Sequence, residues 1–487
     1  MSKKIKYTAI IIKQPLIDWY LVMMLFVLVC FAFSKQALAQ QKKNVLFIVV
    51  DDLRPALGCY GDQLASSPNI DSLAKAGTVF KAAYSQQAVC APSRASFMTG
   101  KKPDRTKVWN LETHFRTVLP NVVTLPQHFK NHGYQSMQIG KIYHDPQKAQ
   151  DLISWSMPEV LAVTTNKGKY VLDSNLAKAP KATVSEAADV PDSAYIDGMV
   201  ADKAVVALKK IGDKPFFMAV GFRRPHLPFS VPASYWKKSI NTKFPIAVDT
   251  ANGVNIPSYS KHTSVELRGY TDIPDFGSID EKLSAELIRG YYTSVSFVDE
   301  QIGKVLRQLK NSGLDKNTIV VLFSDHGFHL GEHGLWGKTT NAKIDTRVPL
   351  IVLDPMSKKQ PSTFDEPVQL VDVYATLSDL CHLSPPETDG ESFAKVIQSK
   401  PFSGLGMAFS QFPNQMKFKD RPEIMGYAVH TKQFRYTEWI ELKTERVVAT
   451  ELYDYHTDPS ENNNVAGGVQ YKKIISKLST AIKYYRN

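Results

Sequence analysis

The chain has 487 residues, of which 43% are hydrophobic and 22% are charged, and its formal net charge is +12. These values are typical of a soluble globular protein and exclude a largely disordered chain. The length allows one large domain with a smaller one, or two to three domains of average size.

The first 39 residues have the pattern of a secretory signal peptide. Four lysines at positions 3, 4, 6 and 13 precede an apolar run at residues 19–33, and Ala37-Leu38-Ala39 then gives an A-x-A cleavage pattern. The run is short for a membrane span and Lys35 interrupts it early, although an uncleaved anchor is the alternative. We therefore predict an exported protein, periplasmic or secreted, with no stable membrane span after cleavage.

Cleavage would leave a net charge of about +8 and three cysteines, Cys59, Cys90 and Cys381. Three cysteines are too few for a disulfide-dense scaffold, so the fold must depend on its core. The positive balance suits an anionic substrate, but a solvated basic surface explains it equally well.

The first strand is predicted at Asn44–Val50, a continuous β-branched and aliphatic run that indicates burial on both faces of a parallel or mixed sheet. It ends directly in Asp51-Asp52. Ligand and metal sites in open α/β sheets lie beyond the carboxyl ends of strands, so these carboxylates could hold a hard cation. A helix cap or a turn is the structural alternative.

The next motif is Cys90-Ala91-Pro92-Ser93-Arg94, which leads into a segment that can start a helix. A cysteine at a helix N-terminus beside a guanidinium has its thiolate form favoured and becomes reactive. A small cysteine buried on a loop is the alternative.

Strands and helices are then expected to alternate. Strands are predicted at residues 134–139, 215–222, 318–323 and 348–353, and a hairpin at 425–441. Helices are predicted at residues 124–131, 197–211, from 287 to about 313, 372–380, and from 471. Residues 147–189 and 241–276 lack clear periodicity and are predicted to be long loops.

Polar residues follow several of these strands. Lys141 and His144 follow the strand at 134–139, His226 follows 215–222, and Asp325-His326 follows 318–323. If the strands beginning at 44 and 318 lie side by side, three carboxylates and an imidazole converge near Cys90, and such a group needs a cation. Oxygen-rich ligation indicates Ca²⁺ or Mg²⁺ and not zinc. His329 and His333 do not form an HExxH zinc motif.

The C-x-P-S-R spacing of residues 90–94 resembles the signature that type I sulfatases present for oxidation of the cysteine to formylglycine. The opening Leu53-Arg54-Pro55 and the G-E-H-G-x-W-x-K pattern of residues 331–338 resemble the same family. The K-x-x-H spacing of Lys141 and His144 is similar to that of the iduronate-2-sulfatase group. The resemblance covers nearly all of the chain after the signal peptide.

The resemblance implies an α/β fold, an alkaline-phosphatase-like sandwich with a large mixed, mainly parallel sheet between helices. A smaller C-terminal α+β subdomain with an antiparallel sheet would follow. The expected divisions are a signal peptide at 1–39, a sulfatase catalytic domain at 40–395 and the C-terminal subdomain at 396–487.

The resemblance also implies roles for the site residues. Formylglycine made from Cys90 would be hydrated to a gem-diol, one hydroxyl of which attacks sulfur, and Arg94 would stabilise it. The implied metal is Ca²⁺, with Mg²⁺ as the alternative, and its ligands would be Asp51, Asp52, Asp325, His326 and the modified Cys90. Sulfate would be bound by Lys141, His144, His226 and Lys338, with His226 protonating the leaving oxygen. Sugar contacts are expected from Trp109, His114, Phe328, His329 and His333.

These features predict a sulfatase that acts on a sulfated oligosaccharide or polysaccharide, such as a glycosaminoglycan, at a 2-O-sulfated uronic acid. A formylglycine-generating or sulfatase-maturing enzyme would be its partner. The sequence contains no nucleic-acid-binding motif. Two alternatives are a phosphatase or phosphonate monoester hydrolase of the same superfamily, and a non-catalytic protein that binds sulfated glycans.

Overall fold

The computed structural model describes residues 19, 22–24, 42–144, 150–162, 167–247, 253–357, 361–404 and 406–486. The predicted signal peptide and its cleavage point lie outside these residues, apart from four positions in the apolar run. Residues from Lys43 onward form one compact unit. Within the described residues, none of the helices combines the length and the apolar character that a membrane crossing requires.

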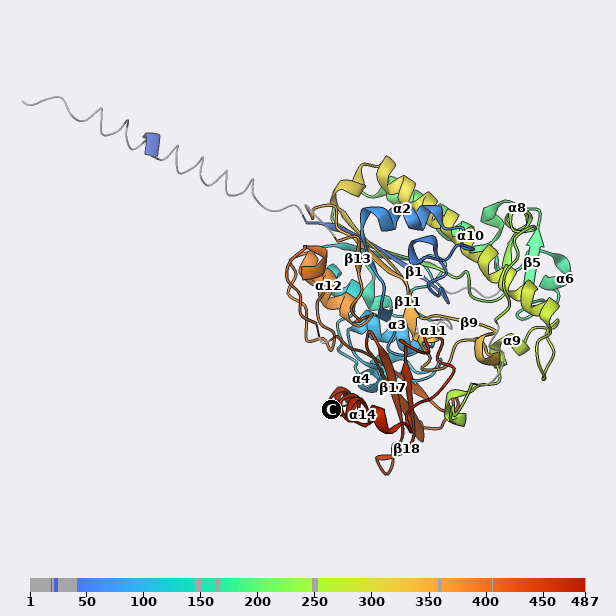
Figure 1. Cartoon of the computed structure of the whole chain (residues 1–487). Helices are drawn as coiled ribbons and strands as arrows, with labels where there is room; N and C mark the ends of the chain where they lie inside the picture. The colour runs from blue at the N-terminus through green and yellow to red at the C-terminus, as the bar shows by residue number, and fades with distance from the viewer. Residues whose placement is uncertain are drawn as a thin grey trace, which may run out of the picture. The chain divides into compact units, whose positions relative to one another are not determined.

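A seven-stranded sheet forms the centre of this unit, with the strand order β13-β2-β12-β8-β1-β6-β4 (Figure 1). β1 pairs in parallel with β6 and β8, whereas β12 is antiparallel to β8 and β2. The predicted mixed, mainly parallel sheet is confirmed. The strands are β1 Asn44–Val50, β2 Thr78–Phe80, β4 Gln135–Gly140, β6 Phe216–Phe222, β8 Thr318–Ser324, β12 Leu350–Leu353 and β13 Thr363–Phe364.

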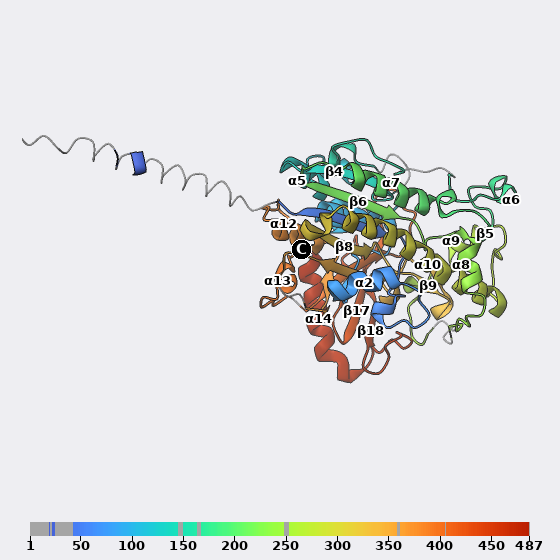
Figure 2. The ribbon, with the colours of Figure 1, turned by 90° about the horizontal axis from the view of Figure 1, so that it is seen from above.

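Helices cover both faces of the sheet because successive side chains of each buried strand point to opposite faces. Leu46 and Ile48 of β1 pack in the cluster that contains α2, α7 and α10, and Val45 and Phe47 pack in the cluster with α3, α5 and α12. Figure 1 shows α2 and α10 on one side of β1 and α3 on the other, and Figure 2 shows α7 and α10 along β6 and β8. These helices are α2 Pro68–Ala76, α3 Cys90–Thr99, α5 Leu125–Asn131, α7 Ile196–Lys210, α10 Glu281–Asn311 and α12 Asp372–Leu380.

The predicted strand at residues 348–353 is two strands in the structure. Pro349 interrupts it because proline has no N–H to donate. β11 Arg347–Val348 joins a small sheet with β3 Ala83–Tyr84 and β14 Val368–Gln369, while β12 stays in the central sheet. Two further small sheets pair β5 Ser185–Ala188 with β7 Phe229–Pro232, and β9 His329–Leu330 with β10 Trp336–Gly337.

Short α-helices connect the main elements, and two of them, at residues 173–176 and 265–268, lie in the regions predicted as long loops. The helices of one or two turns are α4 Pro103–Thr106, α6 Asp173–Leu176, α8 Ala233–Lys238, α9 Val265–Arg268, α11 Lys343–Thr346 and α13 Ala394–Ile397. α9 matters most, because it carries a side chain into the site described below.

The C-terminal part is a four-stranded antiparallel sheet with one long helix, which confirms the predicted architecture. Its strands are β15 Ala408–Pro413, β16 Ile424–His430, β17 Phe434–Glu441 and β18 Arg446–Asp454. The helix is α14 Lys472–Arg486, whose Leu478 and Ile482 are buried against Met425 and Tyr436 of the sheet.

Candidate active site

Two neighbouring strands of the central sheet bring acidic residues together. β1 and β8 run parallel with Val50 opposite Ser324, so Asp51-Asp52 and Asp325-His326 leave the sheet at the same edge. The backbone N–H of Asp52 donates to Asp325 Oδ1 at 3.2 Å. The convergence predicted from these two strands is confirmed.

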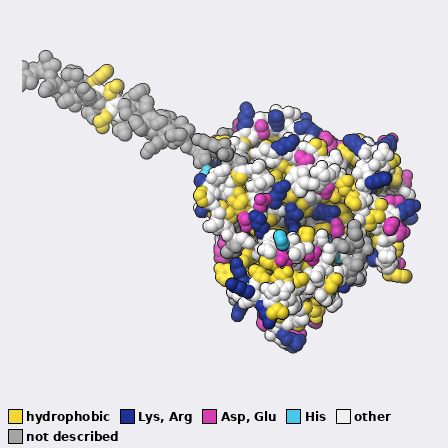
Figure 3. All heavy atoms as spheres, in the orientation of Figure 1, with side chains coloured by type: hydrophobic (Ala, Val, Ile, Leu, Met, Phe, Trp, Pro, Cys, Tyr) yellow, Lys and Arg dark blue, Asp and Glu magenta, His cyan; other side chains and the backbone are white. Residues whose placement is uncertain are grey.

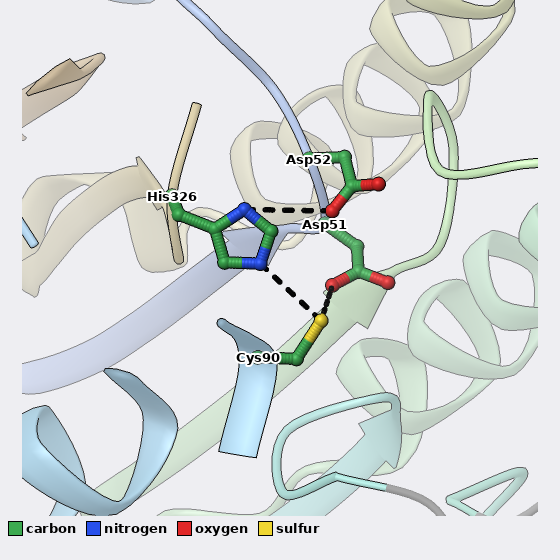
Figure 4. Close-up of side chains that lie close together, drawn as sticks. All are labelled: Asp51, Asp52, Cys90 and His326. Atoms are coloured by element: carbon green, nitrogen blue, oxygen red, sulfur yellow. Dashed lines mark hydrogen bonds and ion pairs between the residues drawn. The ribbon is translucent and has the colours of Figure 1, made fainter. Parts of the chain in front are cut away.

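Cys90 is the first residue of α3 and lies beside these carboxylates. Its side chain is almost fully buried, and its Sγ is 3.6 Å from Asp51 Oδ1 and 3.3 Å from His326 Nε2. Asp51, Asp52, Cys90 and His326 each offer one atom within 4.8 Å of the others, which makes this group a possible metal site. Figure 4 shows the four side chains pointing toward one another.

Arg94 lies one helical turn after Cys90 and holds two of the carboxylates. Its Nη2 donates to Asp51 Oδ1 and its Nε donates to Asp325 Oδ2, both at 2.9 Å, and its side chain is fully buried. Its Nη1 donates to the carbonyls of Lys141 and Ile142. The guanidinium therefore joins α3, β1, β8 and the segment after β4.

Two lysines complete a ring of cations around the site. Lys141 Nζ lies 2.6 Å from Asp51 Oδ2, and Lys338 Nζ lies 2.9 Å from Asp52 Oδ2. His226 Nε2 lies 4.0 Å from Asp52 Oδ2. The side chains of Lys141, Lys338 and His226 all point to carboxylates that the sequence predicted as metal ligands.

The protonation of the site follows from burial and charge. Burial opposes ionisation of Asp51, but Lys141 and Arg94 outweigh it and hold the pKa of Asp51 well below its usual range. Burial raises the pKa of Asp325, with Arg94 opposing that effect. Burial and the Lys141 charge hold the pKa of His144 well below its usual range, so this imidazole is neutral. His144 Nδ1 is buried and makes no hydrogen bond to any residue that the structure describes.

The expected activation of the Cys90 thiol by a neighbouring guanidinium is wrong. Burial and the Asp51 carboxylate raise the pKa of Cys90 well above its usual range. Arg94 cannot reverse this because it is engaged by Asp51 and Asp325. The unmodified thiol is therefore protonated at neutral pH and is a weak nucleophile.

One residue of the site was missed by the sequence reasoning. Glu266 on α9 places Oε1 3.1 Å from His226 Nε2 and Oε2 2.8 Å from Lys338 Nζ. Burial opposes its ionisation, but the charges of Lys338 and His226 hold the pKa of Glu266 well below its usual range. A single acidic residue in a stretch without periodicity gives no signal in the sequence.

Comparison with known proteins shows the family. Residues 43–383 match the family model described as Sulfatase, and residues 331–487 match the one described as N-sulphoglucosamine sulphohydrolase, C-terminal. The chain belongs to the sulfatase family. It is a sulfuric ester hydrolase with an alkaline-phosphatase-like fold.

Relatives of this sulfatase span nearly its whole length. Iduronate 2-sulfatase of Mus musculus is 32% identical, and the alignment covers 89% of this chain and 93% of the mouse protein. A solved structure of a protein in complex with its substrate D-glucosamine-2-N,6-O-disulfate has a TM-score of 0.74 at 22% identity, covering 91% of this chain and 97% of that one. A phosphonate monoester hydrolase of Agrobacterium radiobacter has a TM-score of 0.75 at 21% identity, with 91% and 95% covered.

Two aromatic side chains that were expected to contact sugar, Trp109 and Phe328, are buried in the interior of this sulfatase. Trp109 packs beside Phe418 in the cluster of the C-terminal sheet, and its Nε1 donates to Asp104. Phe328 is 1% exposed and stacks on Tyr291. These two positions do not support a sugar contact, because the side chains are packed inside the protein.

The three histidines of that expected group differ in exposure. His329 is fully buried and its Nδ1 lies 2.6 Å from Asp345 Oδ1, which removes it from the surface. His114 and His333 are partly exposed and bond the backbone carbonyls of Gln150 and Ser460. Of the five side chains, only His114 and His333 keep surface that a substrate could reach.

Proposed function

We propose that this sulfatase hydrolyses sulfate esters of a sulfated carbohydrate through a nucleophile derived from Cys90. The observation that carries the proposal is the convergence of Arg94, Lys141, His226 and Lys338 on Asp51 and Asp52, the carboxylates beside the buried thiol. Four cationic or proton-donating groups held in place before the substrate arrives can stabilise charge that develops on sulfate oxygens.

We propose a uronic acid 2-O-sulfate of a glycosaminoglycan or a similar polysaccharide as the substrate. Two observations support this choice: the mouse relative is named iduronate 2-sulfatase, and Lys141 and His144 have the K-x-x-H spacing. The net charge of about +8 that would remain after signal-peptide cleavage suits a polyanionic substrate. Figure 3 shows Lys and Arg side chains in the middle of one face, beside a histidine.

A divalent cation fits the donors at the edge of the sheet. Asp51, Asp52 and His326 provide carboxylate oxygens and one imidazole, and Asp325 lies against Asp52 N–H. Carboxylates suit Ca²⁺ or Mg²⁺, and we propose Ca²⁺. A thiol is a soft ligand and suits these ions poorly, whereas an oxygen at the same position would complete a hard-ligand set. The metal would polarise the ester and hold the nucleophile in place.

Oxidation of Cys90 to formylglycine, followed by hydration, would supply a hydroxyl group as the nucleophile. The protonated thiol of unmodified Cys90 cannot fill this role. The residues around it have separate tasks in this proposal. Lys141 and Lys338 bind the sulfate oxygens, and Arg94 fixes the carboxylates against which the nucleophile lies. His226, which is at the mouth of the site with 21% of its side chain exposed, donates a proton to the leaving sugar oxygen.

The decisive experiment combines intact mass with sulfate release. Protein exported from cells that contain a sulfatase-maturing enzyme should show the mass change of cysteine to aldehyde at Cys90, and should release sulfate from defined 2-O-sulfated uronic acid oligosaccharides. Cys90→Ala should abolish turnover without unfolding the protein. Cys59→Ala, the control, should keep full turnover. Full turnover by Cys90→Ala would exclude the proposal, and release only from other sulfate positions would exclude the 2-O assignment.

A further inference from the structure

The surroundings of Glu266 differ from those of the other carboxylates in the site. Asp51, Asp52 and Asp325 are at most 1% exposed and lie at the sheet edge. Glu266 comes from α9 instead, and 34% of its side chain is exposed. Glu266 is therefore the carboxylate of this group that solvent, and an entering ester, can reach.

Glu266 is bonded to two groups that have roles in the proposed mechanism: Lys338, which binds the sulfate, and His226, which protonates the leaving oxygen. Its Oε2 lies 2.8 Å from Lys338 Nζ and its Oε1 lies 3.1 Å from His226 Nε2. Lys338 Nζ also lies 2.9 Å from Asp52 Oδ2, so one ammonium group is shared between two carboxylates. The single positive charge of Lys338 therefore already faces two carboxylate charges, those of Asp52 and Glu266, before an anion enters.

A second metal ion does not explain this carboxylate. Asp52, His226 and Glu266 could each offer one atom to a metal within 4.8 Å of the others. The Lys338 ammonium, however, already bonds both Asp52 and Glu266 at distances of 3.0 Å or less. The charge of Glu266 is thus already paired with the lysine and needs no second metal ion.

The charge on Glu266 acts unequally on different esters. A sulfate monoester carries one negative charge, whereas a phosphate monoester carries close to two near neutral pH, since its second pKa is about 6. The repulsion between Glu266 and an anion held by Lys338 is proportional to the charge of that anion. The carboxylate therefore disfavours a phosphate monoester more than a sulfate monoester of the same shape.

We propose that Glu266 is a specificity-determining residue that favours esters with one negative charge over esters with two. The inference rests on the proposed roles of Lys338 in binding the sulfate and of His226 in protonating the leaving oxygen. It predicts that this enzyme discriminates against phosphate monoesters by charge, and that it discriminates less against phosphonate monoesters, which have one negative charge and the same phosphorus centre.

The test uses three aryl esters on the metal-loaded, modified enzyme: 4-nitrophenyl sulfate, 4-nitrophenyl phosphate and 4-nitrophenyl phenylphosphonate. Glu266→Gln removes the charge and keeps the size of the side chain. We expect it to raise the ratio of kcat/KM for phosphate over sulfate by roughly 10- to 100-fold, the effect of one unit charge at short range in a partly buried site. The ratio of phosphonate over sulfate should stay unchanged.

Two variants serve as controls for this measurement. Glu266→Asp keeps the charge and should keep the ratio of the unaltered enzyme. Glu300→Gln removes a carboxylate that is 41% exposed and paired with Arg307 on the outer helix α10, and should change none of the ratios. Binding of the same esters to Cys90→Ala protein, measured by calorimetry, gives a second readout that needs no turnover.

The outcomes separate this inference from the proposed function. If the unaltered enzyme hydrolyses the sulfate but Glu266→Gln leaves the phosphate ratio unchanged, the role of Glu266 is refuted and the sulfatase mechanism stands. The same holds if all three esters change in equal proportion, because that pattern indicates only that Glu266 positions Lys338. If modified enzyme releases no sulfate, the proposed function fails, and the binding of esters to Cys90→Ala still decides the role of Glu266.

Discussion

The guanidinium of Arg94 lies 2.9 Å from Asp325 Oδ2, and both side chains are fully buried. The same guanidinium pairs with Asp51. Buried charges are costly unless they are paired and hydrogen-bonded, so the three side chains depend on one another. Arg94, the last residue of the C-x-P-S-R motif, thus holds the carboxylates of the site in place.

Arg94→Met is expected to destabilise the protein by about 3 to 5 kcal/mol, because it leaves two buried carboxylates without their partner. The measurement is the free energy of unfolding by denaturant, with chelator present. Arg105→Met is the matched control, since Arg105 is 55% exposed and pairs with the exposed Glu387. Its cost should be about 1 kcal/mol or less. Equal costs for the two variants would contradict the pairing seen here.

Calcium is expected to stabilise the protein through the carboxylates at the carboxyl ends of β1 and β8. At a Ca²⁺ concentration of about 100 times the Kd, the gain would be about 2.7 kcal/mol, seen as a rise in Tm over chelated protein. Asp52→Asn should lose most of that rise. Asp354→Asn should keep it, since Asp354 pairs with Lys43 at the amino end of β1. A rise that survives in Asp52→Asn would place the ion elsewhere.

The central strands were predictable from sequence because they are fully buried. β1 was predicted with its observed bounds, and the prediction for β8 ends one residue early, since a run of aliphatic residues has few other conformations available in a large soluble protein. The same buried pattern indicated a parallel or mixed sheet, and the prediction that Asp51 lies near Asp325 depended on the two strands being neighbours, which the structure shows them to be. The carboxylate cluster was therefore within reach of sequence reasoning.

Other features depend on tertiary contacts that the sequence does not display. All ten residues of α3 are buried, so no amphipathic pattern shows that the helix begins at Cys90. Glu266 reaches the site from a four-residue helix in a stretch that reads as a loop. Trp109 and His329 lie near recognisable motifs in the sequence, but proximity to a motif says nothing about whether a side chain faces solvent.

Glu461 is expected to make stability depend on acid pH. Burial opposes its ionisation, but Arg435, at 2.8 Å, holds the pKa of Glu461 at about 2. A lowered pKa in the folded state stabilises it above the unfolded pKa of about 4.3, and this gain is lost as the pH falls toward 2. The gain is about 3 kcal/mol.

Unfolding measurements between pH 2.5 and 7 test this effect. Glu461→Gln should be less stable than the unaltered protein above about pH 4.5, with the difference shrinking as the pH falls. Glu445→Gln, which changes a carboxylate that is 62% exposed, should show no such trend. A difference that grows toward low pH would contradict the assigned direction.

Lys338→Ala is expected to lower kcat for sulfate esters by roughly 100- to 1,000-fold, the usual cost of removing one group that stabilises charge in the transition state. Burial disfavours the charged ammonium, but Asp52 and Glu266 outweigh it and hold the pKa of Lys338 well above its usual range. The loss should therefore be the same at every assay pH at which the enzyme is folded, because the group removed is always charged.

Two variants separate this catalytic effect from a change in structure. Lys304→Ala removes a surface ammonium paired with Asp192 and should keep full activity. Lys338→Arg keeps the charge but replaces a compact ammonium with a planar fork, so it should recover stability better than turnover. If Lys338→Ala kept its kcat and lost only stability, Lys338 would serve to neutralise Asp52 and Glu266, and the sulfate would be bound without the Lys338 ammonium group.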